Sequence, residues 1–280
     1  MIPSRKDLIK SIRNSSPIGI FDSGVGGLTV AKKIFQLLPN ENVIYFGDTG
    51  RYPYGPRSKE IVKKFSFQNV SFLLRQGVKF IVVACNTASA FALEELRKNF
   101  DIPLVGVIEP GATAAIKATR NGRIGVIGTV GTIYSKAYQK SIHRQTPQVK
   151  VYPIPCPLFV SLAEEGYINK AATHLISLEY LNPLIRKRVD TLVLGCTHYP
   201  LLKRVISRIM GEKVKLIDSA EETAKEVKSL LKHSGLLRNS SGRTFRRFYV
   251  SDVPDRFVKV GERFLNGRIT NVKRIDIDKY

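Results

Sequence analysis

Ile81-Val82-Val83-Ala84-Cys85-Asn86-Thr87 is the stretch that decides the fold, and Leu192-Val193-Leu194-Gly195-Cys196-Thr197-His198 repeats its pattern. In both stretches an apolar run is followed by a cysteine and then by small hydroxyl or amide side chains. Such a run is typical of a parallel strand in an α/β protein. The residues after it then lie at the carboxyl end of the sheet, where these folds bind ligands and where a following helix favours a thiolate.

The two cysteines have a structural and a chemical interpretation. A free cysteine is more often a small buried hydrophobic residue than a reactive group. Two cysteines in matching contexts, however, favour a pair of acid/base groups that face one substrate from opposite sides. Cys156, between Pro155 and Pro157, has no such context and is predicted to be structural.

The composition predicts a folded globular protein. The chain has 280 residues, of which 43% are hydrophobic, and only three are cysteines. So few cysteines, without a signal sequence, favour a reducing cytoplasm over a disulfide scaffold. No apolar run reaches membrane-spanning length, so no membrane role is predicted. Residues 1–16 are polar and basic and are predicted to be an N-terminal extension.

The formal net charge of +22 predicts attraction to anions. Residues 228–251 contain six Lys or Arg and no acidic residue, so this segment could bind a polyanion or could simply be solvated surface. No nucleic-acid-binding motif accompanies it. Weak, non-specific binding of nucleic acid therefore remains an open alternative.

Apolar β-type runs alternate with helical patterns along the chain, as in parallel sheets joined by crossover helices. The predicted strands cover residues 18–21, 43–46, 80–84, 104–107, 124–127, 149–154, 191–194, 214–217, 244–250 and 269–275. Predicted helices include 27–38, 58–76, 87–99, 170–188 and 220–231.

Internal sequence similarity predicts two similar α/β lobes with the active site in the cleft between them. Residues 18–24 resemble residues 124–131, and the Cys85 unit resembles the Cys196 unit. Each half thus has a glycine-rich strand end followed by a cysteine strand end. The predicted boundaries place 17–106 and 219–280 in the first lobe and 107–218 in the second.

Further candidates lie at the predicted strand ends. The loop 22–27, DSGVGG, could bind a carboxylate or phosphate through its backbone N–H groups, or could be a tight turn capped by Asp22. The loop 47–57, rich in Gly, Pro and Tyr, could shape a pocket or be a rigid surface turn. His198 could assist Cys196 as a proton partner, and Asp22 could do the same for Cys85. A zinc site on these four residues lacks the usual ligand spacing, and a Cys-His hydrolase leaves one cysteine without a role.

Seven short motifs occur in one order along the chain: 21–28 (FDSGVGGL), 47–49 (GDT), 52–57 (YPYGPR), 84–89 (ACNTAS), 107–111 (VIEPG), 127–129 (IGT) and 194–200 (LGCTHYP). Together they resemble the bacterial glutamate racemases of the cofactor-independent aspartate/glutamate racemase superfamily. The resemblance covers nearly the whole chain from Pro17 onward.

The resemblance implies interconversion of L- and D-glutamate without a cofactor or metal, which would supply D-glutamate for peptidoglycan. The family's catalytic cysteines correspond to Cys85 and Cys196, and its assisting groups to Asp22 and His198. Its substrate contacts correspond to Asp22, Ser23, Tyr54, Gly55, Asn86, Thr87, Thr197 and His198, with Thr129 and Glu109 as further cleft residues. The residues alone leave open an aspartate racemase, or a basic nucleic-acid-binding relative, and allow a homodimer.

The chemistry of racemisation agrees with a pair of thiols. Inverting a stereocentre through a planar carbanion requires one base to remove the Cα proton and an acid on the opposite face to return a proton. One cysteine must then be a thiolate while the other is a thiol. A negative Asp22 beside Cys85 would oppose ionisation of the thiol, so Asp22 is predicted to be a proton relay or an orienting group.

Overall fold

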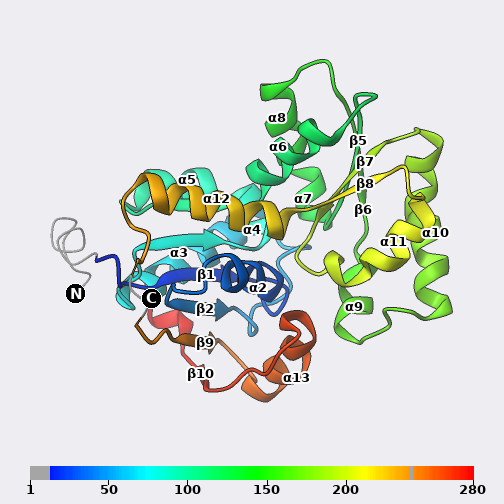
Figure 1. Ribbon diagram of the computed structural model, residues 1–280. Coiled ribbons are helices and arrows are strands. Elements are labelled where there is room, and N and C mark those ends of the chain that lie inside the picture. The colour runs from blue at the N-terminus through cyan, green and yellow to red at the C-terminus, as the bar shows by residue number, and fades with distance from the viewer. Residues whose placement is uncertain (1–12, 240–241) are drawn as a thin grey trace.

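The computed structural model describes residues 13–239 and 242–280, which are organised around two parallel sheets (Figure 1). Residues 1–12 of the predicted N-terminal extension, and positions 240–241 of the basic segment, lie outside the described residues. The strands are β1 (Ile18–Asp22), β2 (Val43–Gly47), β3 (Phe80–Val83), β4 (Leu104–Gly106), β5 (Arg123–Gly128), β6 (Lys150–Pro155), β7 (Thr191–Gly195), β8 (Lys215–Asp218), β9 (Arg246–Val250) and β10 (Val272–Arg274). Each predicted strand overlaps one of these.

The first sheet has the strand order β10-β9-β2-β1-β3-β4, and the second has the order β6-β5-β7-β8. Every neighbouring pair is parallel. The carboxyl ends of all strands in one sheet therefore lie at the same edge. This confirms the predicted α/β class with two mostly parallel sheets.

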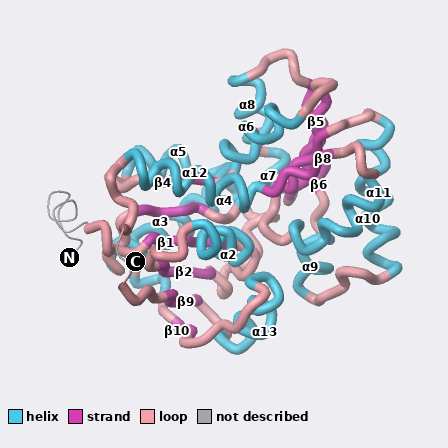
Figure 2. Tube along the Cα trace, viewed as in Figure 1, coloured by secondary structure: helices cyan, strands magenta, loops and turns pink. Residues whose placement is uncertain are grey.

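Helices cover both sheets (Figure 2). They are α2 (Leu28–Leu37), α3 (Lys59–Arg75), α4 (Asn86–Phe91), α5 (Leu93–Asn99), α6 (Ile108–Ala118), α7 (Val130–Tyr134), α8 (Ala137–Gln145), α9 (Leu158–Glu164), α10 (Ala171–Arg186), α11 (Lys203–Met210), α12 (Ser219–His233) and α13 (Pro254–Leu265), with the short 3-10 turns η1 (Tyr199–Leu202) and η2 (Ile277–Lys279).

The prediction of one helix over 87–99 was wrong, because the chain bends at Ala92 and forms α4 and α5 instead. Ala92 has φ −114° and ψ −26°, so its φ departs from the usual α-helical value of about −63°. The bend allows α4 to contact α7 beside the second sheet while α5 packs on β4 of the first.

The alternation of side chains along each strand builds a core on both faces of each sheet. On β1, Ile18 and Ile20 join a cluster that includes Leu28 of α2, while Phe21 joins a cluster on the opposite face. The second sheet has a corresponding pair of clusters. Both faces are therefore buried.

The chain passes from the first sheet to the second between β4 and β5, and returns after β8. Helix α6 packs in the core of the second sheet, whereas α12 packs with α2 in the core of the first. This topology is compatible with the predicted lobes. The predicted boundaries at 106/107 and 218/219 stay predictions.

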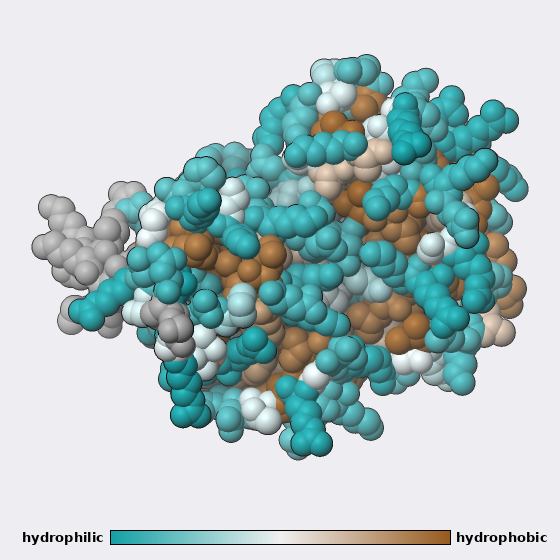
Figure 3. Space-filling view, in the orientation of Figure 1, coloured by the Kyte–Doolittle hydropathy of each residue, from teal (hydrophilic) through white to brown (hydrophobic). Residues whose placement is uncertain are grey.

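The surface is largely polar. On the face seen in Figure 3, hydrophilic residues cover most of the outer surface and are interrupted by smaller hydrophobic areas. None of the described helices combines the length and the apolar character needed to cross a membrane.

Candidate active site

A cavity of about 370 Å³ contains both predicted catalytic cysteines in its wall. Cys85 directly follows Ala84 at the carboxyl end of β3, and Cys196 directly follows β7. The cavity thus lies where the carboxyl ends of the two sheets meet. Both thiols are free and nearly buried.

Cys85 caps the N-terminus of α4. Its Sγ accepts a hydrogen bond from Ala88 N at 3.5 Å, and it lies 3.7 Å from Ser23 Oγ. Burial and the nearby charge of Asp22 raise the pKa of Cys85 to about 12, although these two hydrogen bonds act in the opposite direction. Cys85 is therefore a thiol at neutral pH.

Cys196 lies beside an imidazole. His198 Nδ1 is 3.8 Å from Cys196 Sγ, and its Nε2 is 2.9 Å from Glu164 Oε1. Burial alone would lower the pKa of His198, but hydrogen bonds to Cys196 and Glu164, together with their charges, raise it to about 10. His198 is therefore an imidazolium at neutral pH, with one N–H towards the sulfur and one towards the carboxylate.

Asp22 is completely buried and does not form part of the cavity wall. Its Oδ2 accepts a hydrogen bond from Gly24 N at 2.9 Å, and its Oδ1 lies 3.5 Å from Thr197 Oγ1. Burial raises the pKa of Asp22, against the lowering effect of His198. The carboxyl group thus connects the 22–27 loop of the first sheet to Thr197 of the second.

The structure brings most of the predicted substrate-binding residues into the cavity wall and leaves two out. The wall includes Ser23, Tyr54, Gly55, Asn86, Thr87, Thr129, Thr197 and His198. Glu109, in contrast, is half-exposed on α6, where it pairs with Arg144 and Arg97, and it faces a different cavity. Asp22 is the other residue outside the wall.

The family model described as Asp/Glu/Hydantoin racemase matches residues 18–227 of the chain, which is most of its length. The chain belongs to this racemase family. It is therefore an amino-acid racemase, an isomerase, and the resemblance inferred from the seven motifs is confirmed.

Relatives of this racemase are similar over almost their whole length. A curated glutamate racemase from Geobacter metallireducens is 56% identical over 93% of this chain and 97% of its own. The crystal structure of a glutamate racemase isoform from Bacillus anthracis has a TM-score of 0.91 at 45% identity, covering 94% of this chain and 98% of its own. A glutamate racemase from Francisella tularensis, solved in complex with D-glutamate, has a TM-score of 0.90 at 41% identity, covering 95% and 100% of the two chains.

Contacts between the two halves of the racemase close one side of the cavity. Gly131 N at the start of α7 donates to Gly55 O at 2.9 Å, and the hydroxyls of Thr87 and Thr129 are 2.9 Å apart. A Cβ atom at Gly26 would overlap with the side chains of Thr197 and His198. Only glycine therefore permits this approach of the 22–27 loop to the second sheet.

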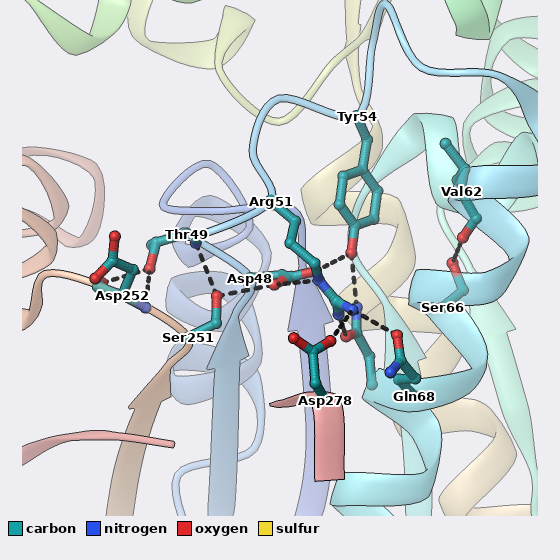
Figure 4. Close-up of polar contacts among 12 residues, drawn as sticks. Asp48, Thr49, Arg51, Tyr54, Val62, Ser66, Gln68, Ser251, Asp252 and Asp278 are labelled. Carbon is teal, nitrogen blue, oxygen red and sulfur yellow. Dashed lines mark hydrogen bonds and ion pairs between the residues drawn. The ribbon is translucent and has the colours of Figure 1, made fainter. Parts of the chain in front are cut away.

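The loop 47–57, which carries Tyr54 and Gly55, is held by a polar network (Figure 4). Asp48 accepts hydrogen bonds from Tyr54 Oη, from Arg51 and, at 2.8 Å, from Ser251 Oγ. Burial and the charge of Asp48 raise the pKa of Tyr54 well above its ordinary value, so the phenol remains a donor. The loop is thus a rigid part of the cavity wall.

Glu164, at the end of α9, was not predicted from the sequence. It forms part of the cavity wall, contacts His198, and lies 3.9 Å from Arg256 of α13. Burial raises its pKa, but hydrogen bonds from His198 and Tyr52 and the charges of His198 and Arg256 reverse the shift, so that the pKa is lowered. No local pattern distinguishes this glutamate from Glu165, because its partner lies 34 positions away in the sequence.

One interpretation of the sequence is a zinc site on Cys85, Cys196, His198 and Asp22. Among residues 13–239 and 242–280, no group of three or more His, Cys, Asp or Glu side chains is arranged to hold a metal ion. The four residues instead form hydrogen bonds with their neighbours, as described above.

Proposed function

We propose that this racemase interconverts L- and D-glutamate by a 1,1-proton transfer between two cysteines, without a cofactor. The observation that carries the proposal is that Cys85 and Cys196, each at the end of a parallel strand, form part of the wall of one cavity. A substrate Cα placed between them could lose its proton to one sulfur and gain a proton from the other on the opposite face. The names of the similar proteins support glutamate rather than aspartate as the substrate.

The electrostatic surroundings of the two thiols differ. The raised pKa of Cys85 favours its thiol form, and the imidazolium of His198 lies with Nδ1 3.8 Å from Cys196 Sγ, where its N–H would stabilise a thiolate. When Cys196 is the thiolate, it removes the Cα proton and Cys85 donates one on the opposite face. For the other enantiomer the two cysteines exchange these roles.

The cavity also provides donors for the substrate carboxylates. Hydroxyl groups of Ser23, Thr87, Thr129 and Thr197 form part of its wall, together with the amide of Asn86. The Cα proton is much less acidic than a thiol, so donors that follow the growing enolate-like charge must lower the barrier. Exclusion of water between the two sheets strengthens these interactions.

Asp22 acts, in this proposal, as an orienting group rather than as a direct substrate ligand. Its carboxyl group contacts Gly24 N and Thr197 Oγ1 and does not hydrogen-bond to Cys85. It therefore fixes the loop that carries Ser23 and the hydroxyl of Thr197. In the cell, we infer a cytoplasmic role in supplying D-glutamate for peptidoglycan.

The decisive experiment uses L-glutamate and L-aspartate in deuterated water, with racemisation followed by circular dichroism and the α-proton by NMR. A two-base enzyme should incorporate deuterium into the product much faster than into recovered substrate, because the returned proton comes from the second, solvent-exchanged thiol. Cys85→Ser and Cys196→Ser should each reduce turnover of both enantiomers by about 10²- to 10⁴-fold.

Cys156→Ser provides the matched control. Cys156 is fully buried, its Sγ points to Ile154 O at 3.7 Å, and it does not form part of the cavity wall. The variant should retain turnover. Near-native rates in either of the other two serine variants would reject the two-base mechanism, and a faster reaction with aspartate would reject the assigned substrate.

A further inference from the structure

One polar group in the cavity wall has no partner of its own. Asn86 is 2% exposed, and its buried Nδ2 has no hydrogen-bond partner among residues 13–239 and 242–280. A buried N–H₂ group without a partner is unfavourable, and an acceptor supplied by a ligand would complete its hydrogen bonding. A substrate carboxylate is the matching acceptor, because an amide N–H₂ can only donate.

The opposite end of the same amide is held from the other half of the molecule. Tyr138 Oη of α8 donates a hydrogen bond to Asn86 Oδ1 at 2.8 Å. Asn86 begins α4 beside the first sheet, whereas α8 packs on the second, so this bond crosses between them.

We propose that Tyr138 is a positioning residue that fixes which end of the Asn86 amide faces a substrate carboxylate. Oxygen and nitrogen of an asparagine amide have nearly the same shape, so only the surrounding hydrogen bonds distinguish its two orientations. With Tyr138 donating to Oδ1, the Nδ2 group is available to the substrate. In the flipped orientation Oδ1 would face the carboxylate and repel it.

The position of the phenol is well defined. Tyr138 is 2% exposed, and its ring lies close to two glycines: a Cβ at Gly195 would be 3.1 Å from Cε2, and one at Gly111 would be 3.3 Å from Cε1. The ring therefore fills a slot between the end of β7 and α6. Burial raises the pKa of Tyr138, which keeps the phenol protonated and able to donate at neutral pH.

This inference depends on the proposed role of Asn86 in binding glutamate, and the test uses three variants of the full chain: Tyr138→Phe, Asn86→Ala and the double variant. The phenylalanine keeps the ring in its slot and removes only the hydroxyl. Tyr138→Phe should raise the KM for glutamate by about 3- to 10-fold, with a smaller change in kcat, because the loss of one hydrogen bond weakens binding of substrate and transition state alike. In the Asn86→Ala background the same change should alter kcat/KM by less than about two-fold, since its effect passes through the amide.

Tyr199→Phe is the matched control. Tyr199 is equally buried, and its hydroxyl donates to Cys156 O at 2.8 Å, away from the cavity wall. The Tyr199→Phe variant should have a lower midpoint of thermal unfolding without a higher KM for glutamate. If Tyr138→Phe leaves the KM unchanged, or lowers kcat/KM equally with and without Asn86, Tyr138 has only a structural role and the inference is rejected.

A second measurement separates this inference from the proposed function. The side-chain ¹⁵N–H₂ signals of Asn86, recorded by NMR without substrate, should shift and broaden in Tyr138→Phe as the amide begins to flip. An unchanged signal would overturn the inference even if glutamate is racemised. A shifted signal in a protein that does not bind glutamate would instead reject the proposed function and leave the Tyr138 contact intact.

Discussion

The two cysteines have similar positions in the fold but different electrostatic partners. Cys85 lies near the carboxyl group of Asp22, whereas Cys196 lies beside the His198 imidazolium, which is in turn held by Glu164. A carboxylate opposes the thiolate form and an imidazolium favours it. The asymmetry of the site therefore comes from single residues around two nearly equivalent strand ends.

Together with Cys196, the Glu164 carboxylate extends the alkaline range in which His198 remains charged. The pKa of His198 is raised from 6.5 to about 10, so its contribution to stability is complete below about pH 6.5 and is lost as the pH rises through about 10. Glu164→Gln removes the opposite charge. We expect the alkaline fall of kcat/KM to occur about 1 to 3 pH units lower than in the native enzyme.

The pH dependence of kcat/KM is measured in both reaction directions from about pH 6 to about pH 10.5. Glu179→Gln, which removes an exposed carboxylate from α10, is the control and should leave the alkaline fall where it is in the native enzyme. An unchanged alkaline fall in Glu164→Gln would show that another group controls it.

At the scale of elements, the cavity wall depends on loops that are tied to distant parts of the chain. The 47–57 loop is joined to the end of β9 in two places: Ser251 Oγ donates to Asp48 and accepts from Gly50 N at 2.8 Å, and Thr49 bonds with the backbone of Asp252. Strand β9 is also paired with β2, which leads into the loop. The C-terminal part of the chain therefore sets the position of Tyr54 and Gly55.

Ser251→Ala should loosen this loop. We expect a loss of about 1 to 3 kcal/mol of unfolding free energy, because the hydroxyl bonds to a buried carboxylate, and a KM increased by about 2- to 5-fold. Chemical denaturation and steady-state kinetics measure the two effects. Ser207→Ala on the exposed face of α11 is the control, and a Ser251 variant that behaves like it would contradict the proposed coupling.

At the scale of the whole molecule, the formal net charge of +22 surrounds a site that is proposed to take a substrate of net charge −1. A positive field increases the rate at which an anion reaches its site, and dissolved salt screens this field. A field of this kind would assist substrate capture without depending on any one lysine or arginine.

We therefore expect kcat/KM for glutamate to fall several-fold as the salt concentration rises from about 20 to about 200 mM, while kcat at saturation changes little. Steady-state rates in sodium chloride measure this effect, and sucrose at equal osmolarity is the control. A kcat/KM that does not depend on salt would contradict a role of the net charge in substrate capture.

The sequence by itself determined the α/β class, the ten strands and the two strand-end cysteines. These follow from local information: an apolar run of four to six residues specifies a buried strand, and the residue after it lies at the carboxyl edge wherever the strand is placed. Ser23, Asn86, Thr87, Thr129 and Thr197, which the family resemblance assigned to substrate binding, all follow strand ends and lie in the wall of one cavity.

Only the tertiary structure decided which groups contact each other across the two sheets. The Glu164–His198 pair, the location of Glu109 outside the cavity and the Tyr138–Asn86 bond all depend on residues far apart in the sequence. A hydrogen bond is formed over about 3 Å and requires a defined geometry, so it is fixed by how the helices pack and not by the pattern of any one segment. The sequence therefore specifies the cysteines, and the packing of the two sheets specifies their chemical surroundings.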